Sequence, residues 1–315
     1  MSERHALVTG GAGGIGNHLV GLLLEKGWHV RVVDNFSSGT RANLARFSGR
    51  KEFEFRELDV LDLDGLKGAM EGIDFVWHLA ANPDIRKGII ETDLDLRQGP
   101  VATRNVLEAM RVRGTKGIAF SSSSTVYGFP RTFPTPEDYG PLLPESVYGG
   151  SKLACEGLIS SFAHTYGMQG WIFRFANIIG PGATHGVIYD FIMKLKKDPT
   201  RLEVLGDGRQ RKGYQWVTDC VGAMVHCTET ANERVNVFNL APEDTISVAE
   251  IARQVVDAWG GTARIEFTGG ERGWAGDVPQ QNLAIDRLRS TGFQSRYNSQ
   301  EAVRKTIEVL RQELA

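Results

Sequence analysis

A tyrosine and a lysine stand four residues apart in the run Tyr148-Gly149-Gly150-Ser151-Lys152. On a helix, this spacing places both side chains on one face. A free phenol has a pKa of about 10 and is a poor base at neutral pH, but a neighbouring ammonium favours the phenolate. The pair therefore predicts that Tyr148 acts as a general acid or base toward a hydroxyl group, with Lys152 lowering the pKa of its phenol.

Four consecutive serines follow a short apolar run, in Ser121-Ser122-Ser123-Ser124-Thr125-Val126-Tyr127-Gly128. Ligands of α/β sheets bind at the carboxyl ends of the strands. A hydroxyl at such an end can share a hydrogen bond with a reacting oxygen and relay its proton. One or two of these serines are enough for that role, and the others are interpreted as turn hydroxyls.

A glycine-rich turn precedes a helical pattern, in Thr9-Gly10-Gly11-Ala12-Gly13-Gly14-Ile15-Gly16. Gly10 permits a tight turn, Gly13 permits the backbone to approach a pyrophosphate, and Gly16 permits the helix to pack closely on the strand. The amino end of the helix then presents free N–H groups to the phosphates. The spacing predicts a dinucleotide-binding turn.

An aspartate ends the second strand-like run. Asp34 follows Gly16 by 18 residues, near the ~20 that dinucleotide-binding units show. A carboxylate there accepts hydrogen bonds from the adenosine ribose hydroxyls and repels a 2′-phosphate, so the sequence favours NAD over NADP.

Strand and helix patterns alternate in the first half of the chain, which predicts βαβ units, a parallel sheet and an α/β fold of the Rossmann-type, doubly wound kind. The expected strands are 6–8, 30–34, 53–58, 75–79, 118–120 and 171–175, and the expected helices are 14–26, 94–112 and 146–166.

The pattern changes after Gly180-Pro181-Gly182, where strands become short and irregular segments long. We expect an NAD-binding domain over 1–180, which includes the Tyr–Lys helix, and a smaller C-terminal substrate-binding lobe over 181–315. The chain is expected to cross between the two.

Composition excludes several classes of protein. The 315 residues carry 36 basic and 38 acidic side chains, a net charge of −2, which gives no support to a nucleic-acid partner. Three cysteines without a CxxC pair argue against a disulfide scaffold, and the seven histidines show no ligand spacing, so no metal site is expected. No apolar run reaches the ~18 residues that span a bilayer. We therefore expect no membrane partner and a cytoplasmic enzyme.

These motifs together resemble the extended short-chain dehydrogenases/reductases, and among them the nucleotide-sugar epimerases of the UDP-glucose (UDP-galactose) 4-epimerase type. The resemblance covers essentially the whole chain. It is carried by TGGAGGIG (9–16), DNFSSG (34–39), HLAANP (78–83), SSSSTVYG (121–128), YGGSK (148–152), RFANIIGPG (174–182), GDGRQRK (206–212) and RGWAGDVP (272–279).

The resemblance implies which residues bind the cofactor NAD. Glycines and Ile15 would meet the pyrophosphate, an acid and its neighbours the ribose, and Asp59 with Val60 the adenine. The full set is Gly10, Gly13, Gly14, Ile15, Gly16, Asp34, Asn35, Ser37, Gly39, Asp59, Val60, Leu79, Ala80, Ala81, Tyr148 and Lys152.

The resemblance also implies a catalytic group and a UDP-sugar substrate. Ser123 matches the catalytic Ser/Thr of the family, Tyr148 its base, and Lys152 the residue that holds the ribose and tunes Tyr148. Asn177 would meet the substrate diphosphate, and Lys212 and Arg272 would add positive charge to it. The substrate set is Arg86, Ser123, Ser124, Tyr148, Asn177, Val187, Lys212, Arg272 and Asp277.

Three positions depart from the family pattern. Gly14 replaces a usual phenylalanine, and Gly99 stands where an asparagine is common, so that one cofactor contact is missing or supplied by Gln98. Lys212 replaces an arginine and loses its bidentate fork. The Lys212 departure bears on which base or sugar is preferred, more than on the phosphate role itself.

The resemblance leaves alternatives open. Relatives that dehydrate sugars need an Asp–Glu pair where this chain has Ser124-Thr125, which favours epimerisation at C4 through a transient 4-keto sugar. UDP-glucuronate 4-epimerases share these motifs and would need polar groups near C6, for which Thr184, His185, Ser124 and Arg86 are candidates. Another NDP-sugar epimerase or reductase, and a non-catalytic NAD-binding sensor, are further alternatives.

The helices expected at 94–112 and 146–166 carry apolar side chains on more than one face. Paired helices of this kind can build a two-fold four-helix interface. Relatives of this type commonly dimerise in this way, so we expect a homodimer.

Overall fold

The computed structural model describes residues 3–273 and 278–314, and this part of the chain divides into two compact units. Unit 1 comprises Met1–Gly128, Gly140–Arg174 and Val221–Phe238, and unit 2 comprises Phe129–Tyr139, Phe175–Cys220 and Asn239–Ala315. The sequence predicted a division near residue 180. In the structure, 129–139 precedes that position but belongs to unit 2. The segment 221–238 follows it but belongs to unit 1, because its helix and strand complete the sheet of that unit.

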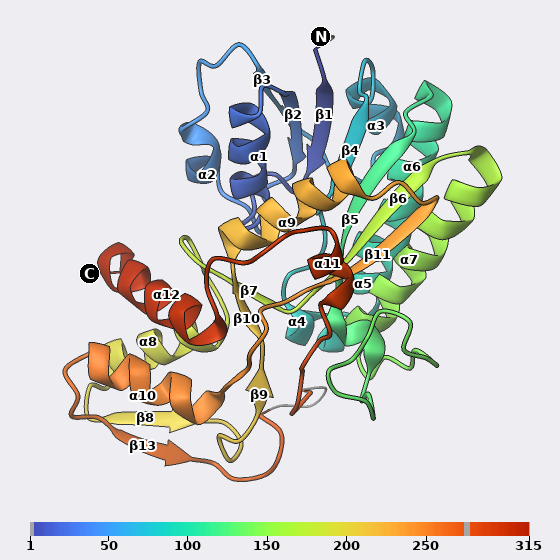
Figure 1. Ribbon diagram of the computed structural model, residues 1–315. Helices are drawn as coiled ribbons and strands as arrows, with labels where there is room; N and C mark the ends of the chain where they lie inside the picture. The colour runs from blue at the N-terminus through green and yellow to red at the C-terminus, as the bar shows by residue number, and fades with distance from the viewer. Residues whose placement is uncertain (1–2, 274–277, 315) are drawn as a thin grey trace. The chain divides into compact units, whose positions relative to one another are not determined.

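Seven strands of the described chain form one sheet, in the order β11-β6-β5-β4-β1-β2-β3, which is centred on unit 1 (Figure 1). The pairings of β1 with β2 and β4, of β2 with β3 and of β4 with β5 are parallel. The carboxyl ends of these strands therefore meet at one edge of the sheet. The strands are β1 (His5–Thr9), β2 (His29–Asp34), β3 (Phe53–Glu57), β4 (Phe75–His78), β5 (Gly117–Ser123), β6 (Gln169–Phe175) and β11 (Val235–Leu240).

Helices cover both faces of this sheet, as the predicted βαβ pattern requires (Figure 1). On one face, α3, α6 and α7 pack side by side and bury an apolar core that includes Leu66, Met110 and Ile159. The helices of this unit are α1 (Gly16–Glu25), α2 (Arg41–Ala45), α3 (Leu63–Ala69), α4 (Ile85–Ile90), α5 (Thr92–Leu96), α6 (Ala102–Arg113), α7 (Val147–Tyr166) and most of α9 (Val217–Thr230), with the 3-10 turn η2 (Ser124–Tyr127).

The helix expected over 94–112 is interrupted. Between α5 and α6 lies one π-helical segment, η1 (Arg97–Val101), which contains Pro100. Proline has no N–H to donate and its ring crowds the preceding turn, so a regular helix cannot continue through it. The chain nevertheless stays helical over 92–113, so the expected long helix is present, and the proline that the sequence interpretation neglected explains its π-helical stretch.

Unit 2 has its own apolar core, in which Ile192, Leu202, Val255 and Val303 are fully buried. Its strands pair in twos: β10 with β7, β12 with β9 and β13 with β8. Its elements are β7 (Asn177–Ile179), α8 (Val187–Lys197), β8 (Arg201–Val204), β9 (Arg211–Lys212), β10 (Tyr214–Trp216), β12 (Ile246–Ser247), α10 (Val248–Ala258), β13 (Arg264–Phe267), α11 (Asp286–Ser290) and α12 (Ser299–Glu313).

Within the described ranges, no helix combines the length and the apolar character that crossing a membrane requires.

Candidate active site

The glycine-rich turn lies between β1 and α1, as its sequence predicts. Gly10 adopts a φ of +71°, a conformation that favours glycine. A Cβ on Gly16 would collide with the carbonyl oxygen of Gly10, so the first turn of α1 packs directly on the loop. The Gly13 amide donates to the Gly10 oxygen at 3.1 Å. A pyrophosphate can therefore come close to the backbone at the amino end of α1.

Asp34 ends β2 beside this turn and is buried. Its two carboxylate oxygens accept from the backbone amides of Ala12, at 2.9 Å, and Phe36, at 2.8 Å. Each oxygen keeps a lone pair for a further donor. The acid is thus fixed against the glycine turn with acceptor capacity for ribose hydroxyls, and the residues present fit NAD.

The other expected cofactor residues surround the same edge. Asn35 donates to Asp59 at 2.9 Å and accepts from the amide of Ser37 at 2.9 Å. A Cβ on Gly39 would lie 2.7 Å from the backbone of Ala12. Ile15 precedes α1, Val60 is buried, and Leu79, Ala80 and Ala81 follow the end of β4.

The four serines differ in their partners. Ser121 donates to the His78 carbonyl at 3.4 Å and Ser122 to the Glu156 carboxylate at 2.5 Å, so both are held within the fold. Ser123 accepts from the amide and hydroxyl of Thr125 and hydrogen-bonds to Tyr148. Ser124 is buried in η2. Ser123 therefore meets the tyrosine, as the resemblance implies.

Tyr148 lies in the first turn of α7, whose N-cap, Ser146, accepts from the Gly149 amide at 3.0 Å. Desolvation and the carboxylate of Asp95 raise the pKa of its phenol well above 10, while the hydrogen bond with Ser123 lowers it. The pKa of the phenol therefore shifts opposite to the lowering expected from Lys152, and desolvation is the largest cause. The phenol of Tyr148 is therefore protonated at neutral pH in this structure.

Lys152 lies one turn further along α7 and is 3% exposed. Its Nζ donates to the Ser121 carbonyl at 2.7 Å and lies 5.6 Å from the centroid of the Tyr148 ring. Burial lowers the pKa of Lys152 to about 8. Helix α7 thus carries the tyrosine and the lysine on one face, as the four-residue spacing predicts.

A buried carboxylate, which the sequence did not indicate, faces this pair. Asp95 on α5 is 2% exposed and accepts from Asn82 at 2.9 Å. Its Oδ2 has no hydrogen-bond partner among the described residues. Its negative charge raises the pKa of both Tyr148 and Lys152. The sequence signal that could have indicated Asp95 is the Asn82-Pro83 turn after β4, because this turn brings the side-chain amide of Asn82 to the Asp95 carboxylate.

A second group behind the site is also new. Glu156, on the same helix as Lys152, forms a buried ion pair with Arg174 of β6, with Nη2–Oε2 at 2.7 Å and Nε–Oε1 at 3.1 Å. Arg174 also donates to the Tyr127 hydroxyl at 3.0 Å. Since Ser122 binds the same carboxylate, the pair ties α7 to β5 and β6.

The structure shows what a side chain would meet at two of the positions that depart from the family pattern, Gly14 and Gly99. A Cβ on Gly14 would meet nothing within 4 Å, so this position is open. A Cβ on Gly99 would lie 3.0 Å from the Ser151 hydroxyl, so the asparagine that the pattern expects there would be crowded by α7. The sequence interpretation that Gln98 supplies the contact stays a prediction.

Among the expected substrate residues of unit 2, Asn177 lies beside the chain that follows Lys212. The backbone and side-chain nitrogens of Asn177 donate to the Gly213 carbonyl at 3.1 and 3.2 Å, directly after Lys212. The Gln281 amide donates to the Arg211 carbonyl at 2.9 Å and the Arg211 amide donates to the Pro279 carbonyl at 2.8 Å, so residues 279–281 adjoin β9. Arg272 is exposed, with its guanidinium 4.6 Å from the centroid of the Phe129 ring. Val187 begins α8.

Two further expected residues are placed less fully. Arg86 lies on α4 of unit 1. Asp277 lies outside the described residues.

The strand order, the glycine turn and the Ser123–Tyr148–Lys152 group define an extended short-chain dehydrogenase/reductase. The chain belongs to the NAD dependent epimerase/dehydratase family, whose profile matches residues 6–241. Solved structures similar to this fold include complexes with NAD, and this chain is an NAD-dependent enzyme of that family.

Relatives with several activities are similar to the chain. The UDP-glucose 4-epimerase of Mycolicibacterium smegmatis is 31% identical over 313 residues, 97% of this chain and 98% of that protein. A solved UDP-galactose 4-epimerase is 39% identical, with a TM-score of 0.89 over 99% of this chain and 100% of that one. UDP-glucuronic acid decarboxylase 1 of Xenopus tropicalis is 27% identical over 99% of this chain and 73% of that protein.

Proposed function

We propose that the protein interconverts UDP-glucose and UDP-galactose, which differ only in the configuration at C4. The observation that carries the proposal is the convergence of Ser123, Tyr148 and Lys152 at the carboxyl end of β5. A phenol in this position can take the proton of a sugar hydroxyl and return it. Ser124-Thr125 in place of an acidic pair favours epimerisation over dehydration, because neither hydroxyl ionises at neutral pH.

In this proposal, Tyr148 holds the C4 hydroxyl proton while C4 is oxidised, and gives it back after the 4-keto sugar has turned over. Ser123 hydrogen-bonds the same oxygen and keeps the phenol in place. Bound NAD supplies the acceptor and donor of hydride, and its positive nicotinamide favours the phenolate. Asn177, Lys212 and Arg272 hold the diphosphate by hydrogen bonds and positive charge.

The proposed activity can be tested with a panel of UDP-hexoses and UDP-hexuronates, separating the products after incubation with the full chain. We expect equilibration of UDP-glucose with UDP-galactose without consumption of NAD. UDP-glucuronate is the second candidate substrate, since a relative is named for decarboxylating it. Exclusive turnover of UDP-glucuronate to its 4-epimer, or release of CO₂ from it, would overturn the proposal for the neutral hexose.

Replacing Ser123 with alanine is expected to lower kcat about 10- to 100-fold. The change removes a hydrogen bond to a charged or partly charged oxygen, which is worth about 1.5–3 kcal/mol. The matched control is Ser161→Ala, which removes a hydroxyl that donates only to Gly157 on the exposed side of α7. Steady-state rates of both variants measure the effect, and equal rates would argue against a role for Ser123.

Replacing Asp95 with asparagine is expected to move the pH profile of kcat/KM to lower pH by about one unit. Loss of the negative charge stabilises the phenolate of Tyr148 and destabilises the ammonium of Lys152, so both pKa values fall. Asp93→Asn is the control, because Asp93 is exposed on the same helix and pairs with Arg97 at 3.0 Å. A profile that stays in place would show that Asp95 does not tune the pair.

We also propose that the protein is a homodimer through the outer faces of η1, α6 and α7. Val101 and Val112 are 41% and 48% exposed there, and a Cβ on the neighbouring exposed Gly157 meets nothing within 4 Å. Gly157→Glu is therefore expected to leave the monomer folded and to halve the mass in light scattering. Gly68→Glu on α3, with equally open surroundings, is expected to remain dimeric. A monomeric parent protein at micromolar concentration would contradict the dimer.

A further inference from the structure

Two histidines and a glutamate lie together at the amino ends of β1 and β2. The parallel register pairs His5 directly with His29, and the His29 amide donates to the Arg4 carbonyl at 2.9 Å, so the pairing continues toward the start of the chain. Glu3 precedes His5 by two residues of extended chain, which places both side chains on one face. This group lies at the opposite end of β1 from the glycine turn.

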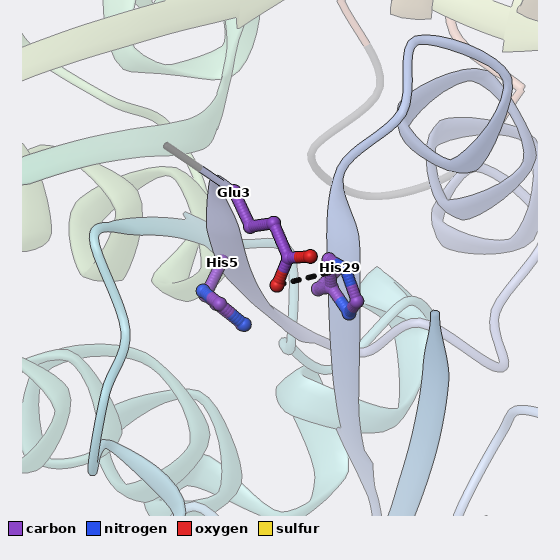
Figure 2. A group of neighbouring side chains, drawn as sticks. All are labelled: Glu3, His5 and His29. Atoms are coloured by element: carbon purple, nitrogen blue, oxygen red, sulfur yellow. Dashed lines mark ion pairs between the residues drawn. The ribbon is translucent and has the colours of Figure 1, made fainter. Parts of the chain in front are cut away.

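The three side chains are close enough to share one ion. The Nε2 of His29 lies 3.5 Å from the Oε2 of Glu3, and the two imidazole centroids are 4.8 Å apart with the rings tilted by 34°. One ligand atom from each residue can be chosen so that all lie within 4.8 Å of one another. Figure 2 shows the Glu3 carboxylate directed toward His29, with the His5 ring nearby.

A tetrahedral ion with ligands at 2.0–2.2 Å holds its ligand atoms about 3.4 Å apart. Because the ligand atoms lie within 4.8 Å of one another, they have to close by up to about 1.4 Å. The side chains of Glu3, His5 and His29 are 72%, 41% and 30% exposed, so rotation of these chains is not blocked by the core. The backbone needs no change, because the parallel register already places His5 opposite His29.

A fourth residue completes the surroundings of His5. The carboxylate of Asp74 accepts from the His5 amide at 2.8 Å and lies 3.9 Å from its Nδ1. Histidines that bind metals commonly donate their second ring nitrogen to a carboxylate, which orients the ring. At 3.9 Å the two groups are not hydrogen-bonded, but a small rotation of the exposed His5 ring would bring its Nδ1 to Asp74 and leave its Nε2 for the ion.

We propose that Glu3, His5 and His29 form a site for a divalent transition-metal ion, with Zn²⁺ as the preferred occupant. Imidazole nitrogens with one carboxylate suit Zn²⁺, Co²⁺ and Ni²⁺, whereas Mg²⁺ and Ca²⁺ prefer all-oxygen sites. The ion joins the first two strands of the sheet at their amino ends and stabilises the folded unit, because it binds the folded chain in preference to the unfolded one. The site is separate from the C4 chemistry.

The sequence predicted no metal site, because the histidines show no ligand spacing along the chain. The pair forms across two strands, from residues 24 positions apart. The alternation of Glu3 and His5 was the only local signal.

The test is a titration of the full, tag-free chain with Zn²⁺, followed by calorimetry and thermal unfolding. We expect one ion per chain, and a rise in Tm of several degrees at a free Zn²⁺ concentration about a hundred times Kd. His5→Gln and His29→Gln are each expected to weaken binding at least tenfold, and the exposed His164→Gln is expected to bind like the parent. The three cysteines are buried, so a thiolate site is not expected to compete.

Co²⁺ provides a second readout that does not depend on stability. Its visible absorption is expected to change on binding and to lose that change in His5→Gln. The proposal is overturned if the chain takes up no Zn²⁺ at 100-fold excess over protein, or if both histidine variants bind Zn²⁺ as tightly as the parent. Epimerase activity is expected to be unchanged in His5→Gln, so a failure of the site and a failure of the proposed function are seen separately.

Discussion

Replacing Tyr148 with phenylalanine is expected to lower kcat for C4 epimerisation by about 10²- to 10⁴-fold, the range that a positioned acid or base contributes. Phenylalanine keeps the aromatic ring at this position of α7 and removes only the hydroxyl. The pKa of the phenol is raised in the protein alone, and NAD⁺, when bound, would supply a positive charge that favours the phenolate. The rate is measured by separating the 4-epimers.

The matched control for this variant is Tyr166→Phe, at the other end of α7, where the side chain is 43% exposed. We expect parental activity from it. Bound NAD should be the same in both variants, because the hydroxyl of Tyr148 is one contact among many in the cofactor site. A Tyr148→Phe protein that epimerises at near-parental rate would refute the assignment of the base.

Replacing Glu156 with alanine is expected to lower the free energy of unfolding by about 3–5 kcal/mol, because the Arg174 guanidinium is left buried without its partner. Both side chains are only 6–7% exposed. At about 2–4 °C per kcal/mol, the Tm should fall by roughly 6–20 °C. Denaturant unfolding of the parent and the variant measures the difference.

Two controls show whether burial is the cause. Glu229→Ala breaks an exposed ion pair with Lys26, of 2.8 Å, and should change stability by less than about 1 kcal/mol. The double variant Glu156→Leu with Arg174→Leu should regain most of the loss, because neither charge then remains buried. A loss in the double variant as large as in Glu156→Ala would contradict this explanation.

The parts of the site that depend on local backbone were predictable from the sequence. The positive φ of Gly10 and the close packing of Gly16 follow from the steric freedom that only glycine provides. Asp34 lies beside the turn because a parallel β2 must end where β1 ends. The helical spacing of Tyr148 and Lys152 fixed their common face.

The electrostatics of the site could not be predicted in the same way. The sequence indicated an ammonium beside a phenol but not how strongly the fold desolvates each group, and desolvation is the largest cause of the raised pKa of Tyr148. Asp95 acts on the pair only because the chain folds back after β4, a tertiary arrangement with no local pattern. Which partner each of the four serines meets likewise depends on residues distant in sequence, such as Glu156 for Ser122 and Tyr148 for Ser123.

The transfer of hydride within one bound sugar is the central claim, and deuterium at C4 tests it most directly. The full chain is supplied with UDP-galactose deuterated at C4, and in parallel with the deuterated UDP-galacturonate, in ordinary water. We predict UDP-glucose that keeps its deuterium at the inverted C4, with no accumulation of NADH. Appearance of the deuterium in water, or an unchanged C4 configuration in both sugars, would contradict the account.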